Sequence, residues 1–247
     1  MPAKTRRKGS QQDPKKSPKP SNSTYQPPPW PIFKPLVPWS DLSLNILAAN
    51  QIVTISNFWT TSLCRTYTSF LSSLPLITTP GRPKKGEAVR VNDRFQIDDA
   101  AFATRLWQDT ALKELVLGVD NSQELWGGEV LGLNPSIRIY RYSKGQFFDK
   151  HYDDSNNVTL PTPSPTQAKT TWTLLLYLTS PSTGCIGGET VFYPEHANGN
   201  DGSAIVIDLE TGMLLLHRHG ADCMLHEGKE VQQGEKWIIR SDLCVRR

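Results

Sequence analysis

The chain has 247 residues, of which 37% are hydrophobic, and a formal net charge of +3. This length suits one folded domain, with or without a tail. There is no run of about eighteen apolar residues and no apolar core near the N-terminus, so the sequence predicts neither a membrane-spanning helix nor a secretory signal.

The four cysteines (Cys64, Cys185, Cys223 and Cys244) are scattered and form no C-x-x-C pair. This spacing argues against a disulfide framework and against a zinc knuckle. We therefore expect reduced thiols in an intracellular protein.

Residues 1–38 are rich in Pro, Ser, Lys and Gln, and we expect them to be a disordered, basic tail. Residues 1–20 hold seven Lys and Arg residues against one Asp, so the remainder carries a net charge of −3 and gives no strong nucleic-acid signal. The basic clusters Lys4–Lys8 and Lys15–Lys19 resemble a bipartite nuclear-import signal, with a solvated arm as the alternative. A folded domain is expected over residues 39–247, in the cytoplasm, the nucleus or both.

The first elements expected in chain order are a strand over Ile52–Ile55 and a helix capped by Thr60 or Thr61. A second helix is expected from residue 98 or 99 to about residue 117. Residues 155–169 read as a polar, Pro-rich loop.

Beyond residue 130 the pattern is dominated by strands and Gly/Pro turns, which predicts an α+β fold whose β-sandwich or barrel carries the site. The expected strands are Ser136–Tyr142, Trp172–Leu178, a turn entering a strand over Gly187–Phe192, Ala204–Asp208, Met213–Arg218 and Lys236–Val245.

The segment His151-Tyr152-Asp153 carries the first candidate chemistry. On a β-strand, residues i and i+2 point to the same face, so His151 and Asp153 can offer a nitrogen and an oxygen to one point. A histidine from a distant strand would complete two imidazoles and one carboxylate, the ligand set of non-heme Fe(II) oxygenases.

Three segments in order resemble prolyl 4-hydroxylase-type 2-oxoglutarate/Fe(II) dioxygenases. They are RIYRYSKGQFFDKHYD at residues 138–153, TWTLLLYLTSPSTGCIGGETVFYPE at residues 171–195 and HEGKEVQQGEKW at residues 226–237. With the helices before them, these matches cover roughly residues 50–245. The resemblance implies a double-stranded β-helix, or jelly roll, with flanking N-terminal helices.

The resemblance also implies a site. Fe(II) would be held by His151, Asp153 and His226, with the histidines at 217 and 219 more typical of packed residues. The distal carboxylate of 2-oxoglutarate would pair with Lys236 and accept a hydrogen bond from Tyr142. Arg240, four residues further on, is the alternative anchor, because arginine clamps carboxylates with two hydrogen bonds. O2 would be the oxidant and ascorbate the expected reductant.

The implied reaction is hydroxylation of a C–H bond with release of succinate and CO2, on a prolyl or other side chain of a protein. A small molecule or free amino acid is the alternative substrate. A non-catalytic jelly-roll module would not need the complete ligand set, and a zinc hydrolase would not explain the cation beyond His226. The sequence indicates no oligomeric state.

Overall fold

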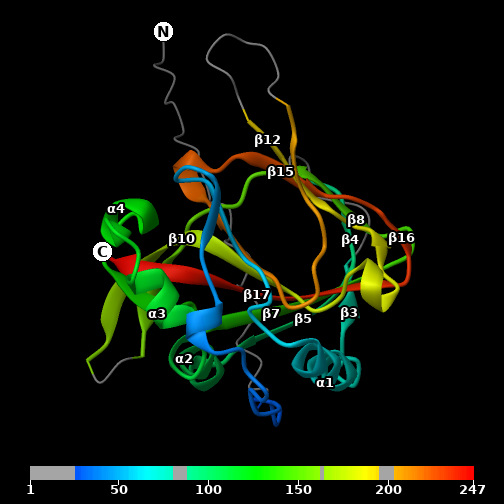
Figure 1. The fold of residues 1–247 in the computed structure, drawn as a ribbon, viewed down its shortest axis with the longest axis horizontal. Coiled ribbons are helices and arrows are strands. Elements are labelled where there is room, and N and C mark those ends of the chain that lie inside the picture. The colour runs from blue at the N-terminus through cyan, green and yellow to red at the C-terminus, as the bar shows by residue number, and fades with distance from the viewer. Residues whose placement is uncertain (1–25, 80–87, 162–163, 195–202) are drawn as a thin grey trace, which may run out of the picture.

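The computed structural model describes residues 26–79, 88–161, 164–194 and 203–247. Two antiparallel sheets face each other, and helices cover the outer face of the larger one (Figure 1). This arrangement confirms the predicted α+β class with a jelly-roll core.

The larger sheet, here called the major sheet, runs in the order β1-β2-β14-β10-β17-β7-β5-β3. Two further strands attach to it, β6 beside β17 and β9 beside β10. Its strands are β1 (Asn45–Ala48), β2 (Ile52–Ile55), β3 (Ile77–Thr78), β5 (Asp93–Asp98), β6 (Val130–Leu133), β7 (Ser136–Ser143), β9 (Asn157–Leu160), β10 (Thr166–Tyr177), β14 (Leu214–Arg218) and β17 (Glu235–Arg246).

The smaller sheet, here called the minor sheet, runs in the order β13-β12-β15-β8-β4. A separate two-stranded ribbon lies beside it. The strands of the minor sheet are β4 (Arg90–Val91), β8 (Phe147–His151), β12 (Thr190–Tyr193), β13 (Ile205–Ile207) and β15 (Leu225–Gly228), and those of the ribbon are β11 (Ile186–Gly187) and β16 (Val231–Gln233).

Four α-helices and three short 3-10 turns complete the described residues. They are α1 (Thr61–Leu71), α2 (Ala100–Gln108), α3 (Leu112–Leu117) and α4 (Ser122–Trp126), with 3-10 turns at Trp39–Asp41, Pro181–Thr183 and Gly220–Asp222. None of these helices is long and apolar enough to cross a membrane. Thr60 caps α1 by accepting a hydrogen bond from the Leu63 amide, as expected.

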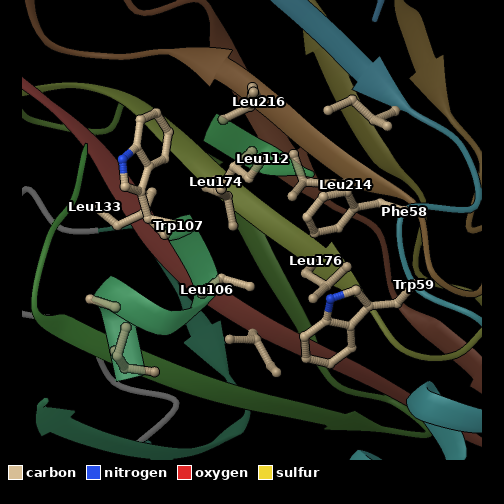
Figure 2. Close-up of a cluster of buried hydrophobic side chains, with 14 of the residues drawn as sticks. Phe58, Trp59, Leu106, Trp107, Leu112, Leu133, Leu174, Leu176, Leu214 and Leu216 are labelled. Atoms are coloured by element: carbon tan, nitrogen blue, oxygen red, sulfur yellow. The ribbon is translucent and has the colours of Figure 1, made fainter. Parts of the chain in front are cut away.

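The main core lies between the helices and the outer face of the major sheet (Figure 2). Leucines from β10 and β14 point towards α2 and α3, because every second residue of a strand faces the same side. The buried side chains labelled in Figure 2 are Phe58, Trp59, Leu106, Trp107, Leu112, Leu133, Leu174, Leu176, Leu214 and Leu216. The other face of these strands is therefore left for the space between the sheets.

Two expected elements differ from the structure. The helix expected up to residue 117 is broken into α2 and α3, because the Thr110 hydroxyl donates to the Leu106 carbonyl and accepts the Leu112 amide. The loop expected over residues 155–169 contains a hairpin of β9 with the start of β10. Leu160 and Ala168 of that hairpin pack with Cys244, which stabilises strands whose exposed faces are polar.

The expected disordered tail also ends earlier than residue 38. Trp30 packs against Phe102 and donates its indole N–H to Asp99, and Phe33 is buried in the main core. Aromatic burial thus holds residues 26–38 on the domain, against the expectation. Residues 1–25, with the candidate import signal at 4–19, lie outside the described residues.

Candidate active site

The candidate site lies between the two sheets, on the inner face of the major sheet. A cavity there is lined by residues from both sheets. From the major sheet come Tyr140 and Tyr142 on β7, Thr173 and Leu175 on β10, His217 on β14, and Lys236, Ile238 and Arg240 on β17. The alternation along each strand puts these residues on the face opposite to the leucine core.

The minor sheet supplies two histidines. His151 ends β8, and it pairs in register with His226 of the neighbouring strand β15. Their rings lie with centroids 4.2 Å apart. Asp153 follows two residues after β8, so it lies just beyond the strand that was expected to carry it.

The structure brings His151, Asp153 and His226 together as a group that could hold a metal ion. Nε2 of His151 is 3.8 Å from Oδ1 of Asp153, and Nε2 of His226 is 4.0 Å from Oδ2. Backbone carbonyls orient both imidazoles through the ring nitrogen that faces away from Asp153. Nδ1 of His151 lies 2.7 Å from the Asp149 carbonyl, and Nδ1 of His226 lies 2.9 Å from the Met224 carbonyl.

Those backbone contacts decide the tautomer of each ring. A carbonyl oxygen can only accept, so Nδ1 carries the proton and Nε2 keeps its lone pair towards the cavity, as is usual for metal-binding histidines. Burial, together with repulsion from His226, lowers the pKa of His151 to about 3. Burial also lowers the pKa of His226. Both rings are therefore neutral near pH 7 and able to donate to a metal.

Asp153 is held by a cation and a hydroxyl. The guanidinium of Arg240 contacts both carboxylate oxygens, with Nη2 3.0 Å from Oδ2 and Nη1 3.3 Å from Oδ1, and Thr173 donates to Oδ2 at 2.8 Å. Burial alone would raise the pKa of Asp153, but Arg240 holds it well below its usual value. The carboxylate is thus charged, oriented and available to a cation, so the donor set fits Fe(II).

Lys236 also lines the cavity, four residues before Arg240 on β17. Its side chain is buried, and Nζ donates to the Gly188 carbonyl at 2.6 Å while lying 5.6 Å and 5.4 Å from the ring centroids of Tyr142 and Tyr177. Burial lowers the pKa of Lys236 to about 8. Among the described residues no carboxylate forms an ion pair with this ammonium, so the cavity offers a buried cation to an acidic ligand.

Gly188 makes this arrangement possible. Its φ of +79° is a conformation that other residues rarely adopt, and a Cβ there would lie 3.1 Å from Cδ of Lys236. The turn expected from Gly187 and Gly188 therefore has a second purpose, because it brings a carbonyl oxygen onto the buried lysine.

Three further residues lie at this site: Thr173 and Cys223, for which the sequence predicted no role in it, and His217, which was expected to be a packed residue. Thr173 contacts Asp153 directly, whereas His217 and Cys223 form a second potential metal-binding group with His226. The strand period could have indicated His217. Residues i and i+2 of a strand share a face, and Leu215 of β14 lies on the inner face, so His217 faces the site as well. His219, by contrast, has both ring nitrogens within 2.9 Å of threonine hydroxyls.

Residues 137–241 match a family model described as the 2OG-Fe(II) oxygenase superfamily. This range contains all the candidate metal-binding and co-substrate residues. No curated protein sequence matches the chain.

Several solved structures have a similar fold at low sequence identity. A Pseudomonas putida prolyl-4-hydroxylase is 17% identical, with a TM-score of 0.55 over 82% of this chain and 96% of that one. A viral collagen prolyl hydroxylase from Paramecium Bursaria Chlorella virus-1, in complex with 2OG, is 18% identical, with a TM-score of 0.50 over 79% and 96%.

HygX from Streptomyces hygroscopicus, with nickel, 2-oxoglutarate and hygromycin B bound, is 14% identical, with a TM-score of 0.51 over 80% and 84%. The family match bears out the expected resemblance to 2-oxoglutarate/Fe(II) oxygenases and the prediction of an enzyme. The solved structures bear out the jelly-roll fold.

Proposed function

We propose that this 2-oxoglutarate/Fe(II) dioxygenase hydroxylates a side chain of a protein substrate, with proline as the first candidate. The observation that carries the proposal is that one cavity is lined both by His151, Asp153 and His226 and by the buried ammonium of Lys236. A metal site alone would not require that cation, whereas a dicarboxylate co-substrate would.

Different side chains would bind the metal and the co-substrate. His151, Asp153 and His226 would hold Fe(II), which together with 2-oxoglutarate and O2 supplies the oxidising chemistry and yields succinate and CO2. Lys236 would bind the distal carboxylate of 2-oxoglutarate, and the buried Tyr142 lies beside it for a hydrogen bond. We propose ascorbate as the reductant that keeps the iron ferrous.

Lys236 is a better candidate than Arg240 for the distal carboxylate. Both residues line the cavity, but the guanidinium of Arg240 already contacts both oxygens of Asp153. Its charge is therefore engaged by a carboxylate of the proposed metal site. We propose that Arg240 orients the metal-binding carboxylate instead.

An open groove beside the site favours a protein substrate over a small molecule. Tyr152, Tyr193, Cys223 and Met224 are among the residues that line it, and the Cys223 sulfur accepts a hydrogen bond from the Asp153 amide. Cys223 therefore links the groove to the backbone of a proposed metal-binding residue. The exposed Tyr152 and the half-buried Tyr193 suit an extended peptide with a proline, the substrate class that the name of the Chlorella virus protein indicates for that protein.

The test is turnover of 2-oxoglutarate by the purified full chain with Fe(II) and ascorbate. We expect succinate release, and we expect Asp153→Ala to abolish it, while Asp154→Ala, which alters the exposed neighbouring carboxylate, leaves it unchanged. Lysate proteins and metabolites incubated with the active enzyme should gain one oxygen, as read by mass spectrometry. Absence of succinate from iron-loaded enzyme under every substrate mixture would refute the proposal.

A further inference from the structure

A third histidine, which is buried, faces the same carboxylate as the two proposed metal-binding histidines. His217 lies on β14, opposite Thr173 of β10, and only 1% of it is exposed. Its Nε2 is 3.8 Å from Oδ2 of Asp153. His226 lies slightly further from the same oxygen, at 4.0 Å, and His151 lies 3.8 Å from the other oxygen, Oδ1.

The ring of His217 is oriented in the same way as the other two. Its Nδ1 lies 3.3 Å from the Arg218 carbonyl, which leaves the lone pair of Nε2 directed into the cavity. His219, two residues on, shows the contrast, because hydroxyl groups occupy both of its nitrogens. Three imidazoles with the same tautomer therefore surround one carboxylate.

Cys223 offers a different grouping with His217 and His226, but its position is less suitable. The sulfur lies 4.0 Å from Nδ1 of His226, the nitrogen that is bonded to the Met224 carbonyl. It is thus beside the occupied nitrogen of that ring. Nε2 of His226 instead faces Asp153, together with Nε2 of His217.

We propose that His217 is a fourth metal donor in the state that lacks 2-oxoglutarate. This inference rests on the proposed metal site at His151, Asp153 and His226. An octahedral metal has six positions, and a chelating co-substrate takes two of them. Four protein donors would then leave none for O2, so His217 has to be off the metal once 2-oxoglutarate is bound.

The structure is consistent with a donor that can leave. The contact that holds Nδ1 of His217 is 3.3 Å long, against 2.7 Å for His151 and 2.9 Å for His226. The ring is therefore held less firmly than the other two. Since binding energies are linked reciprocally, 2-oxoglutarate must weaken the bond to His217 as much as His217 opposes 2-oxoglutarate.

The donor set also predicts a metal preference. Three neutral imidazoles and one carboxylate match the four-coordinate sites that Zn²⁺ favours. Without co-substrate, Zn²⁺ should therefore use all four donors, and zinc should inhibit the enzyme in competition with 2-oxoglutarate.

The experiment is a Co²⁺ titration of the metal-free full chain, followed by visible absorption. The wild type should show the intense bands of a low-coordinate site, and adding 2-oxoglutarate should weaken them. His217→Ala should bind Co²⁺ less tightly without 2-oxoglutarate, by about 5- to 150-fold, which is the usual range of such coupling. With saturating 2-oxoglutarate, the two proteins should differ far less in Co²⁺ affinity.

Two further variants control for misfolding and for binding by Cys223. His217→Gln keeps a polar side chain if the alanine variant folds poorly, which circular dichroism detects, and it should show the same loss. Cys223→Ser should leave the spectrum unchanged. A thiolate charge-transfer band that this variant removes would assign the fourth donor to Cys223 and overturn the proposal.

The His151 and His217 variants distinguish failure of the proposed metal site from failure of the fourth donor. His151→Ala should lose Co²⁺ binding, and if it does not, the metal site of the proposed function fails. If His151→Ala loses binding while both His217 variants match the wild type with and without 2-oxoglutarate, only the fourth donor is refuted.

Discussion

Lys236 is a buried cation whose charge changes close to physiological pH. Burial lowers its pKa to about 8, and a lysine is charged below its pKa. The affinity for 2-oxoglutarate should therefore be constant below about pH 7 and fall above about pH 8, by up to about ten-fold per unit. Calorimetric titration of 2-oxoglutarate into Mn²⁺-loaded protein, from about pH 6 to about pH 9, measures this dependence.

Substitution separates this effect from the titration of other groups. Lys236→Met should weaken 2-oxoglutarate binding at every pH and remove the slope above about pH 8. Lys113→Met, at an exposed lysine on α3, should keep both the affinity and the slope. A slope that persists in Lys236→Met would assign the titration to another residue.

Arg240 and Asp153 form a buried ion pair that should contribute to folding as well as to the site. Removing one partner of such a pair leaves an uncompensated buried charge, so Arg240→Met should lower the free energy of unfolding by about 3–5 kcal/mol. The double variant Arg240→Met with Asp153→Asn should lose less than the sum of the single variants. Urea unfolding with a chelator present measures all three, and simple additivity would contradict the coupling.

Some residues of the site could be predicted from the sequence, whereas their contacts could not. His151, Asp153, His226 and Lys236 stand in short motifs, and the structure brings all four to one cavity. The contact of Arg240 with Asp153 depends on how β17 lies relative to the end of β8, which local spacing does not reveal. The position of His217 was discounted because a histidine on an apolar strand is more often a packed residue.

At the scale of elements, strands with a regular apolar pattern were predictable. Ile52–Ile55 coincides with β2, and the strands expected at 136–142, 172–178 and 213–218 coincide with β7, β10 and β14 within a few residues, except that β10 begins earlier. The hairpin of β9 and β10 was not predictable, because one face of it is polar and its register depends on packing against Cys244. The break before α3 depends on hydrogen bonds of one threonine.

Burial of the segment before α1 can be tested by comparing two adjacent apolar residues, Ile32 and Phe33. Phe33 is 5% exposed and contacts the rings of Trp59, Tyr67 and Phe102, whereas the adjacent Ile32 is 66% exposed. Phe33→Ala should therefore lower the free energy of unfolding by about 3–5 kcal/mol. Ile32→Ala should change it by about 0.5 kcal/mol or less. Equal effects in chemical denaturation would show that this segment does not belong to the core.

At the scale of the whole molecule, the proposed site joins the two sheets. His151 and His226 come from the minor sheet, whereas Thr173, His217 and Arg240 come from the major sheet. Figure 1 shows β15 near the top of the view and β8 at the right, while β10, β17 and β7 run across the middle, below β15. A metal ion bound by the histidines of the minor sheet would also bind a carboxylate that the major sheet orients. It would therefore connect the two sheets and stabilise the fold.

This connection predicts a large thermal shift on ligand binding. A ligand that binds only the folded state at about 100 times its Kd stabilises it by about 2.7 kcal/mol, which for a chain of this size raises the melting temperature by roughly 5–10 °C. Mn²⁺ and 2-oxoglutarate together should produce this rise in differential scanning fluorimetry. Asp153→Ala should show none, while Asp154→Ala should behave as the wild type. An equal rise in Asp153→Ala would mean that metal and co-substrate bind elsewhere.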